Sequence, residues 1–294
     1  VDNARNAVVA WDLKRYSIPL ASSVFEVWAN RCNGIDGHCD DAGALDSVVH
    51  SQNRFGYFAG RPNVAACPTG QIHAVWNRAD DGGVSTIQAA VLEDGGWRRS
   101  GNIARDTLNK QEAVVACAGP DLALAVWINK ENVGPYASNY GLHGNVFSPA
   151  TGWGQSVRVG PVGSFSDGVR VAADRSGRAV VAWEQSGYVW ANRYEPSTQQ
   201  WGDTVLVSSG NQRAFYPAVD IDPQGTATIA WEEKVGAQYG VRARRFFADG
   251  GILEEPEVVA SSAAVRGIRL GISADDTGAT ALIFLSRFEG FGLP

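Results

Sequence analysis

Six stretches of the chain share one pattern of hydrophobic and polar positions. Each begins with a polar or cysteine residue, passes through a few turn-forming residues, and continues as an apolar run that ends on an aromatic side chain. The pattern is most complete in residues 222–231 (DPQGTATIAW) and 174–183 (DRSGRAVVAW). A glycine turn followed by a short apolar run predicts a β-strand. The other copies are residues 2–11, 67–76, 117–127 and 275–284.

The aromatic residue that ends each copy recurs every 48 to 65 residues, and these residues are called the anchors: Trp11, Trp76, Trp127, Trp183, Trp231 and Phe284. A period near 50 residues with four short strands in each unit is typical of a β-propeller blade. We name the strands of a blade A to D, from the centre outward. The anchor ends strand B, and large apolar residues at matched positions are expected to fill the gaps between blades.

The pattern predicts a set of short strands in chain order. They are 7–11, 24–31 and 47–49 in the first copy; 62–66, 71–76, 85–92 and a strand after Trp97 in the second; 113–116, 122–127, 140–147 and 156–159 in the third; 169–173, 179–183, 188–194 and 204–207 in the fourth; 218–221, 226–231, 239–247 and 257–259 in the fifth; and 269–273 and 279–285 in the sixth.

Strand C carries a second repeated phrase, Val-Trp-Ala-Asn-Arg at residues 27–31 and 189–193. Because successive strand side chains point to opposite faces, its small and apolar residues are expected to pack between blades, with the variable residues on the other face. The variable residues are Trp28, Gln88, His143, Trp190 and Arg242.

The predicted fold is therefore all-β, a single β-propeller domain over residues 1–294 with four-stranded blades. Six blades are preferred, because six B strands are present, and five are possible. The first and last blades are expected to be incomplete, because strand A of the first copy is missing and the sixth copy ends early. The start at Val1 in mid-repeat suggests a removed upstream segment.

Charge and cysteine content narrow the class of protein. The net charge of −6 argues against nucleic acid as a partner, and no apolar run is long enough for a membrane span. Cys32 and Cys39 flank a short loop, and Cys67 and Cys117 occupy the same position in neighbouring copies, so two disulfides are expected. Paired cysteines favour a secreted or periplasmic protein. A metal site at Cys32, His38 and Cys39 is the rival interpretation.

No catalytic motif stands out among the polar residues. The repeated Asp (Asp2, Asp174, Asp222 and Asp275) is best explained by its position before a turn, where its carboxylate accepts hydrogen bonds from turn N–H groups. A ring of carboxylates that binds cations is the functional alternative. We therefore expect no metal site and no cofactor, with Ca²⁺ as the one that remains open.

The repeated units Asp-x-x-Gly-x-Ala-x-x-x-Trp, Val-Trp-Ala-Asn-Arg-Tyr and Gly-Trp-Gly resemble those of secreted bacterial β-propeller proteins, the broad sialidase-like and lectin-like group. The resemblance covers nearly the whole chain and implies the propeller fold. The Asp-box pattern of sialidases, with Asp-x-Gly spacing, is not matched.

The D-to-A and B-to-C loops share one face of a propeller, and they differ most between the copies. Aromatic faces and planar polar groups on this face suit a sugar ring. The residues expected to bind a ligand are Arg54, Phe55, Tyr57, Arg61, Arg78, Tyr136, Trp28, Trp190, Arg213 and Tyr216. The same loops also hold Asp167, Glu184 and Phe215.

The resulting hypothesis is a secreted, lectin-like binding propeller that recognises glycan or another surface ligand through loops on one face. Whether the protein is an enzyme is left open, and a binding role without catalysis is favoured. The first alternative is a carbohydrate-active enzyme, a glycoside hydrolase or polysaccharide lyase, with a site on the central axis. The second is a protein-binding scaffold domain of a larger surface protein. The catalytic residues, the ligand and the oligomeric state are left open by the sequence.

Overall fold

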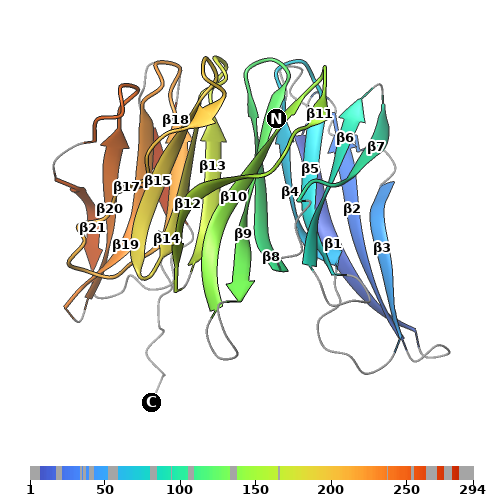
Figure 1. Cartoon of the computed structure of the whole chain (residues 1–294), viewed down its shortest axis with the longest axis horizontal. Coiled ribbons are helices and arrows are strands. Elements are labelled where there is room, and N and C mark those ends of the chain that lie inside the picture. The colour runs from blue at the N-terminus through green and yellow to red at the C-terminus, as the bar shows by residue number, and fades with distance from the viewer. Residues whose placement is uncertain are drawn as a thin grey trace. The chain divides into compact units, whose positions relative to one another are not determined.

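The described part of the chain consists of β-strands joined by turns and loops (Figure 1). The computed structural model describes residues 7–17, 22–33, 35, 38–39, 43–51, 59–79, 85–93, 95–104, 109–132, 138–164, 166–236, 238–252, 255–262, 270–274 and 280–284. Within these residues no helix is long and apolar enough to cross a membrane. The chain divides into two compact units, Val1–Val162 and Gly163–Pro294.

The first unit contains three antiparallel sheets whose strands pair in chain order. The first sheet is β1 (Ala7–Ser17), β2 (Ser22–Cys32) and β3 (Gly43–Ser51). The second is β4 (Ala59–Ala66), β5 (Ile72–Ala79), β6 (Ser85–Glu93) and β7 (Gly96–Asn102). The third is β8 (Asn109–Ala118), β9 (Leu122–Asn132) and β10 (Ser138–Ser148), with β11 (Gly152–Trp153) and β12 (Val157–Gly163) both paired to β10.

The second unit repeats this arrangement. One sheet is β13 (Ser166–Ala173), β14 (Ala179–Gln185) and β15 (Tyr188–Glu195), with β16 (Gln200–Trp201) and β17 (Val205–Leu206) both paired to β15. The next is β18 (Ala214–Ile221), β19 (Ala227–Val235), β20 (Gln238–Phe246) and β21 (Glu257–Ser262). The last pair is β22 (Leu270–Ala274) and β23 (Thr280–Phe284).

The predicted strands all fall within observed strands or overlap them, and the predicted all-β fold is confirmed. The structure adds that strand D is split in the third and fourth copies, into β11 and β12 and into β16 and β17. Whether residues 1–294 form a single domain stays a prediction.

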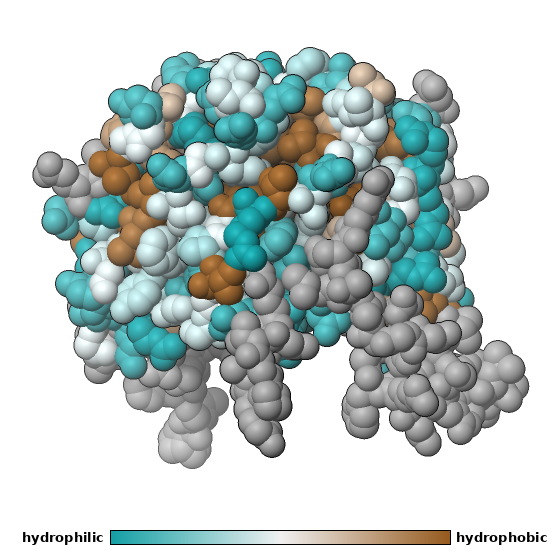
Figure 2. All heavy atoms as spheres, in the orientation of Figure 1, coloured by the Kyte–Doolittle hydropathy of each residue, from teal (hydrophilic) through white to brown (hydrophobic). Residues whose placement is uncertain are grey.

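The anchors form the centre of the packing within each unit. Trp76, Trp127, Trp183 and Trp231 are fully buried, and three of them belong to apolar clusters with the Ala and Val residues of strand C. Trp11 is 36% exposed; it lies on β1, which opens its sheet with no strand A among the described residues. On the surface drawn in Figure 2, the apolar residues lie in small groups between hydrophilic ones.

The repeated Asp is structural in the two copies that are described. The Asp174 carboxylate accepts hydrogen bonds from the backbone N of Ser176 and Arg178 at 2.8 and 3.0 Å. The Asp222 carboxylate accepts one from the N of Thr226 at 2.8 Å. Each Asp N–H also donates to the carbonyl four residues later, which closes the turn before strand B. Asp2 and Asp275 lie outside the described residues.

Both predicted disulfides are present. Cys32 is bonded to Cys39, and Cys67 is bonded to Cys117 across 50 residues of chain. The thiols of Cys32 and Cys39 are consumed in this bond, so the rival metal site at Cys32, His38 and Cys39 does not form in this state. The turn at Cys67 has the same backbone bonds as the Asp turns, from Cys67 N to Gln71 O and from Gly70 N to Cys67 O.

Four A strands share a β-bulge at one repeat position. The pairing register shifts at the start of β4, β8, β13 and β18. Each bulge holds a residue with positive φ: Arg61 (53°), Glu112 (49°), Gly168 (61°) and Tyr216 (51°). The backbone of a residue at positive φ is strained unless the residue is Gly, which has no Cβ. Such bulges redirect side chains and occur near functional sites.

Candidate functional site

A pocket of about 440 Å³ lies in the second unit, where three loops and strand ends meet. Its walls come from the start of β13, from the turn between β14 and β15, and from the start of β18. The lining residues are Ser164, Asp167, Glu184, Ser186, Gly187, Arg213, Phe215 and Tyr216. The D-to-A and B-to-C loops of neighbouring blades therefore converge here.

Two carboxylate side chains line this pocket from adjacent strands. Asp167 on β13 is the direct cross-strand partner of Glu184 on β14. In such pairs the Cβ atoms lie about 4.5 to 5.5 Å apart, so both carboxyl groups are within reach of one small ligand. Glu184 is buried, and an oxygen of Asp167 accepts a hydrogen bond from the N of Gly168 at 2.8 Å. That bond orients the Asp167 carboxylate at the bulge.

A cation and two aromatic rings form the other wall. The Arg213 guanidinium lies 5.6 Å from the centre of the Phe215 ring, and the rings of Phe215 and Tyr216 are 6.2 Å apart. Tyr216 is 49% exposed and occupies the bulge of β18. This wall offers an exposed aromatic surface beside a charged hydrogen-bond donor.

The turn between β14 and β15 fixes the position of Arg213. Ser186 and Gly187 both have positive φ, 56° and 82°, and they form a two-residue hairpin loop of the kind that fits strand twist. The N of Ala214 donates to the carbonyl of Gly187 at 2.9 Å, which ties β18 to this turn. A Cβ at Gly187 would lie 3.2 Å from Nε of Arg213, so glycine is needed for the close approach.

The structure brings two of the predicted ligand-binding residues, Arg213 and Tyr216, into this pocket. Arg61 is exposed at the bulge of β4, where its guanidinium lies 3.9 Å from the Glu112 carboxylate. Arg78 donates to the buried Asp46 at 2.8 Å, and Asp46 also accepts a bond from the Trp76 indole at 2.8 Å. Arg78 therefore stabilises the packing of an anchor.

The remaining predicted residues lie elsewhere. The Trp28 indole is half-buried and donates to Glu26 at 3.3 Å. The Trp190 indole is half-buried and donates to the carbonyl of Gln185 at 3.3 Å. Arg54, Phe55, Tyr57 and Tyr136 lie outside the described residues. The binding role of all ten residues stays a prediction. The expectation that the protein has no metal site and no cofactor, with Ca²⁺ binding left open, also stays a prediction.

Sequence reasoning did not place Asp167, Glu184 and Phe215 among the binding residues, although it assigned them to the loops. One signal was present: an acidic residue directly follows the anchor at Glu184, Glu232 and Asp12. The pairing of Asp167 with Glu184 depends on the β-bulge of β13, which the sequence pattern does not reveal.

A second pocket of about 470 Å³ lies on different elements of the same unit. It is lined by residues of 193–205 and 246–250, including Arg193 and Trp201. Nη2 of Arg193 donates to the carbonyls of Phe246 and Phe247 at 3.0 and 2.9 Å, and burial lowers the pKa of this guanidinium. Arg193 thus links two adjacent sheets. The two pockets are formed by different parts of the repeated unit, so they are not two copies of one site.

No model of a known protein family matches the chain, and no curated protein matches it by sequence. By structure the chain is similar to a Hadza microbial sialidase, with a TM-score of 0.56 and 9% identity over 89% of this chain and 57% of that one. It is also similar to a PL25 polysaccharide lyase, an ulvan lyase bound to -[GlcA(1-4)Rha3S]-, with a TM-score of 0.57 and 12% identity over 91% and 75% of the two chains.

A third similar structure is a protein of unknown function from Dyadobacter fermentans, with a TM-score of 0.50 and 11% identity over 90% and 85% of the two chains. The chain spans less than two thirds of the length of the sialidase. At these identities the similarity establishes the fold alone, which is an all-β propeller. The number of blades, six or five, stays a prediction.

Proposed function

We propose that this protein is a carbohydrate-active enzyme, a glycoside hydrolase or polysaccharide lyase, whose active site is the pocket at Asp167, Glu184 and Arg213. The observation that carries the proposal is the direct cross-strand pairing of two carboxylates that both open into one pocket. The enzyme interpretation, first given as an alternative, takes precedence over the lectin-like one for this reason.

The chemistry of glycoside cleavage fits such a pair. Hydrolysis needs one carboxyl group to protonate the leaving oxygen and a second to act as base or nucleophile, with a separation of about 5 to 10 Å. A lyase needs a base that removes a proton beside a carboxylate, and a cation that stabilises the resulting charge. Asp167 and Glu184 supply the acid and base groups, and Arg213 supplies the cation.

The aromatic wall supplies the affinity for a sugar. The C–H face of a pyranose ring packs on Phe215 and Tyr216, and its hydroxyl or carboxylate groups pair with Arg213. The similarity to a sialidase and an ulvan lyase supports a carbohydrate ligand. The two disulfides support a secreted or periplasmic location, in which polysaccharides are available.

The test is an activity screen on a panel of neutral and acidic polysaccharides. New reducing ends without a new ultraviolet band indicate hydrolysis, whereas an absorbing unsaturated uronate indicates a lyase. Asp167→Asn and Glu184→Gln should each reduce the rate by at least about a hundredfold. Glu257→Gln, which alters an exposed carboxylate on β21, is the matched control.

Full activity in both pocket variants would exclude this site. Selective glycan binding without turnover by the native protein would instead support the lectin-like function. That function is favoured by one specific observation, the exposed Tyr216 beside Arg213, which can hold a sugar without reacting with it.

A further inference from the structure

Three departures from the repeat pattern fall at one place in the first unit. Cys67 and Cys117 stand where the fourth and fifth copies have Asp174 and Asp222. His73 stands three residues before its anchor, where the other described copies have Val8, Leu124, Val180 and Thr228. A histidine at this otherwise largely apolar position occurs only beside the two cysteines.

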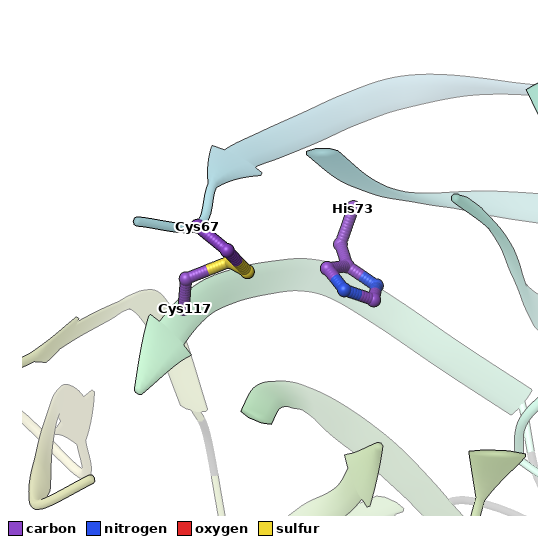
Figure 3. A group of neighbouring side chains, drawn as sticks. All are labelled: Cys67, His73 and Cys117. Carbon is purple, nitrogen blue, oxygen red and sulfur yellow. A yellow bond between two sulfur atoms is a disulfide. The ribbon is translucent and has the colours of Figure 1, made fainter. Parts of the chain in front are cut away.

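The three side chains form a compact cluster. The two sulfur atoms and a ring nitrogen of His73 all lie within 4.8 Å of one another. Figure 3 shows the His73 ring beside the Cys67–Cys117 disulfide. Cys67 and His73 are buried, and Cys117 is partly exposed, with its sulfur 3.7 Å from the carbonyl oxygen of Ala65.

The His73 ring lacks hydrogen-bond partners at this position. Its Nδ1 and Nε2 are both buried without a partner among the described residues. The ring packs on Phe147 with a centroid distance of 4.6 Å, and the Trp153 ring lies at 6.1 Å. Buried polar atoms normally have partners, so the retention of His at a site that suits Val calls for an explanation.

We propose that Cys67, His73 and Cys117 form a thiophilic metal site that the disulfide masks and that reduction exposes. Two thiolates and one imidazole are the ligand set that Zn²⁺ or Cd²⁺ prefers, and a fourth position stays open to water. In a tetrahedral zinc site such ligand atoms are about 3.5 to 3.8 Å apart. Once the S–S bond breaks, the two sulfur atoms must therefore separate while the ring nitrogen of His73 stays within reach of both. This inference is independent of the carbohydrate pocket.

A water-soluble phosphine can reduce the Cys67–Cys117 disulfide. The phosphine takes the oxygen of one water and becomes the phosphine oxide, the S–S bond breaks, and each sulfur gains one hydrogen. Metal binding then displaces the two thiol protons into solvent. Cys117, which is partly exposed, gives the reductant its approach.

The chain contains its own control for this site. Cys32 and Cys39 form a second disulfide with His38 nearby in sequence, but His38 and Cys39 are exposed. Two sulfurs and a histidine are therefore present in both places, and only His73 is buried without partners. Metal binding at the proposed site should therefore depend on His73 and not on His38.

The experiment uses the full chain, reduced with phosphine under anaerobic conditions and titrated with Co²⁺ as a probe for Zn²⁺. The native protein should give a thiolate-to-cobalt absorption band. His73→Val, which introduces the residue of the first and fourth copies, should weaken Co²⁺ binding at least about tenfold. His38→Ala should leave it unchanged. Circular dichroism follows the β-structure throughout.

A reduced, folded protein without the band would overturn the proposal, as would a band that survives His73→Val or disappears with His38→Ala. If reduction removes the β-structure, recovery on addition of Zn²⁺ in the native chain but not in His73→Val supports the site. Failure to recover in both overturns it.

Discussion

At the residue scale, His73 illustrates how burial decides the charge of a side chain. Desolvation lowers the pKa of His73 from 6.5 to about 4, while Glu93 raises it and Arg98 lowers it by smaller amounts. The unfolded chain therefore binds the proton more tightly than the folded one. The stability that depends on neutral His73 is complete above about pH 6.5 and is lost as the pH falls toward 4.

We expect His73→Val to remove this acid sensitivity in the oxidised, metal-free protein. Between pH 7 and pH 4.5 the native chain should lose about 2.5 kcal/mol more unfolding free energy than the variant, because the loss occurs over the two pH units from 6.5 to 4.5 at about 1.4 kcal/mol per unit. Urea titrations at the two pH values measure the difference. His38→Val, at an exposed histidine, is the control, and identical losses in native and His73→Val chains would contradict the prediction.

Gly187→Ala should reduce ligand binding in the proposed pocket. The new Cβ would meet Nε of Arg213 at 3.2 Å, so the guanidinium must shift from its position 5.6 Å from the centre of the Phe215 ring. We expect an increase in the dissociation constant of about tenfold, measured by calorimetry with the glycan that the screen identifies.

The control for this variant is Gly236→Ala. Gly236 also has positive φ, in the turn between β19 and β20, but a Cβ there meets nothing within 4 Å. It reproduces the backbone strain without the contact. Equal loss of affinity in both variants would show that strain, and not Arg213, is responsible.

At the element scale, strands B and C of one blade each carry a tryptophan, and the two differ in burial. Trp183 on β14 is fully buried, and its cross-strand partner Trp190 on β15 is half-buried. Trp183→Ala should cost about 3 to 5 kcal/mol, the range for a buried aromatic residue. Trp190→Ala should cost about 1 to 2 kcal/mol. Thermal unfolding compares them, and an unchanged melting temperature in Trp183→Ala would refute the anchor role.

The strands themselves could be predicted because their apolar runs repeat with a regular period. In the four sheets with four or five strands, strands B and C lie in the middle and carry the continuous apolar runs, so their positions can be found from their own sequence. The split of strand D into β16 and β17 was not predicted, because two-residue pairings leave no pattern. The bulges were not predicted either, since a register shift between strands A and B of one sheet leaves no mark in the apolar pattern.

The candidate site could be predicted only in part for the same reason. The sequence placed Arg213, Tyr216 and Glu184 in loops, and their residue types suggested a sugar. Which of them share a pocket depends on blade packing and on a two-residue turn at Ser186 and Gly187. Arg78 is a residue type that suits a sugar, but its guanidinium pairs with the buried Asp46, which the sequence does not reveal.

At the scale of the whole molecule, the two disulfides restrain the unfolded chain to different extents. The Cys67–Cys117 bond closes a separation of 50 residues and the Cys32–Cys39 bond one of 7. From loop entropy, replacing the first pair with Ser should cost about 4 kcal/mol and the second about 2.5 kcal/mol. Guanidinium unfolding of the two double variants checks the order, and a larger loss for the short loop would contradict it.

The bulges of the A strands have a consequence for how sequences of this kind change under selection. Arg61, Glu112 and Tyr216 hold a left-handed backbone that costs about 1 to 3 kcal/mol each and that glycine, as at Gly168, adopts freely. A library screened for heat resistance alone should therefore accumulate glycine at these three positions. A library screened for heat resistance and ligand capture together should keep the side chains that the ligand touches. Comparison of the two outcomes would map the binding surface even while the chemical identity of the ligand is still open.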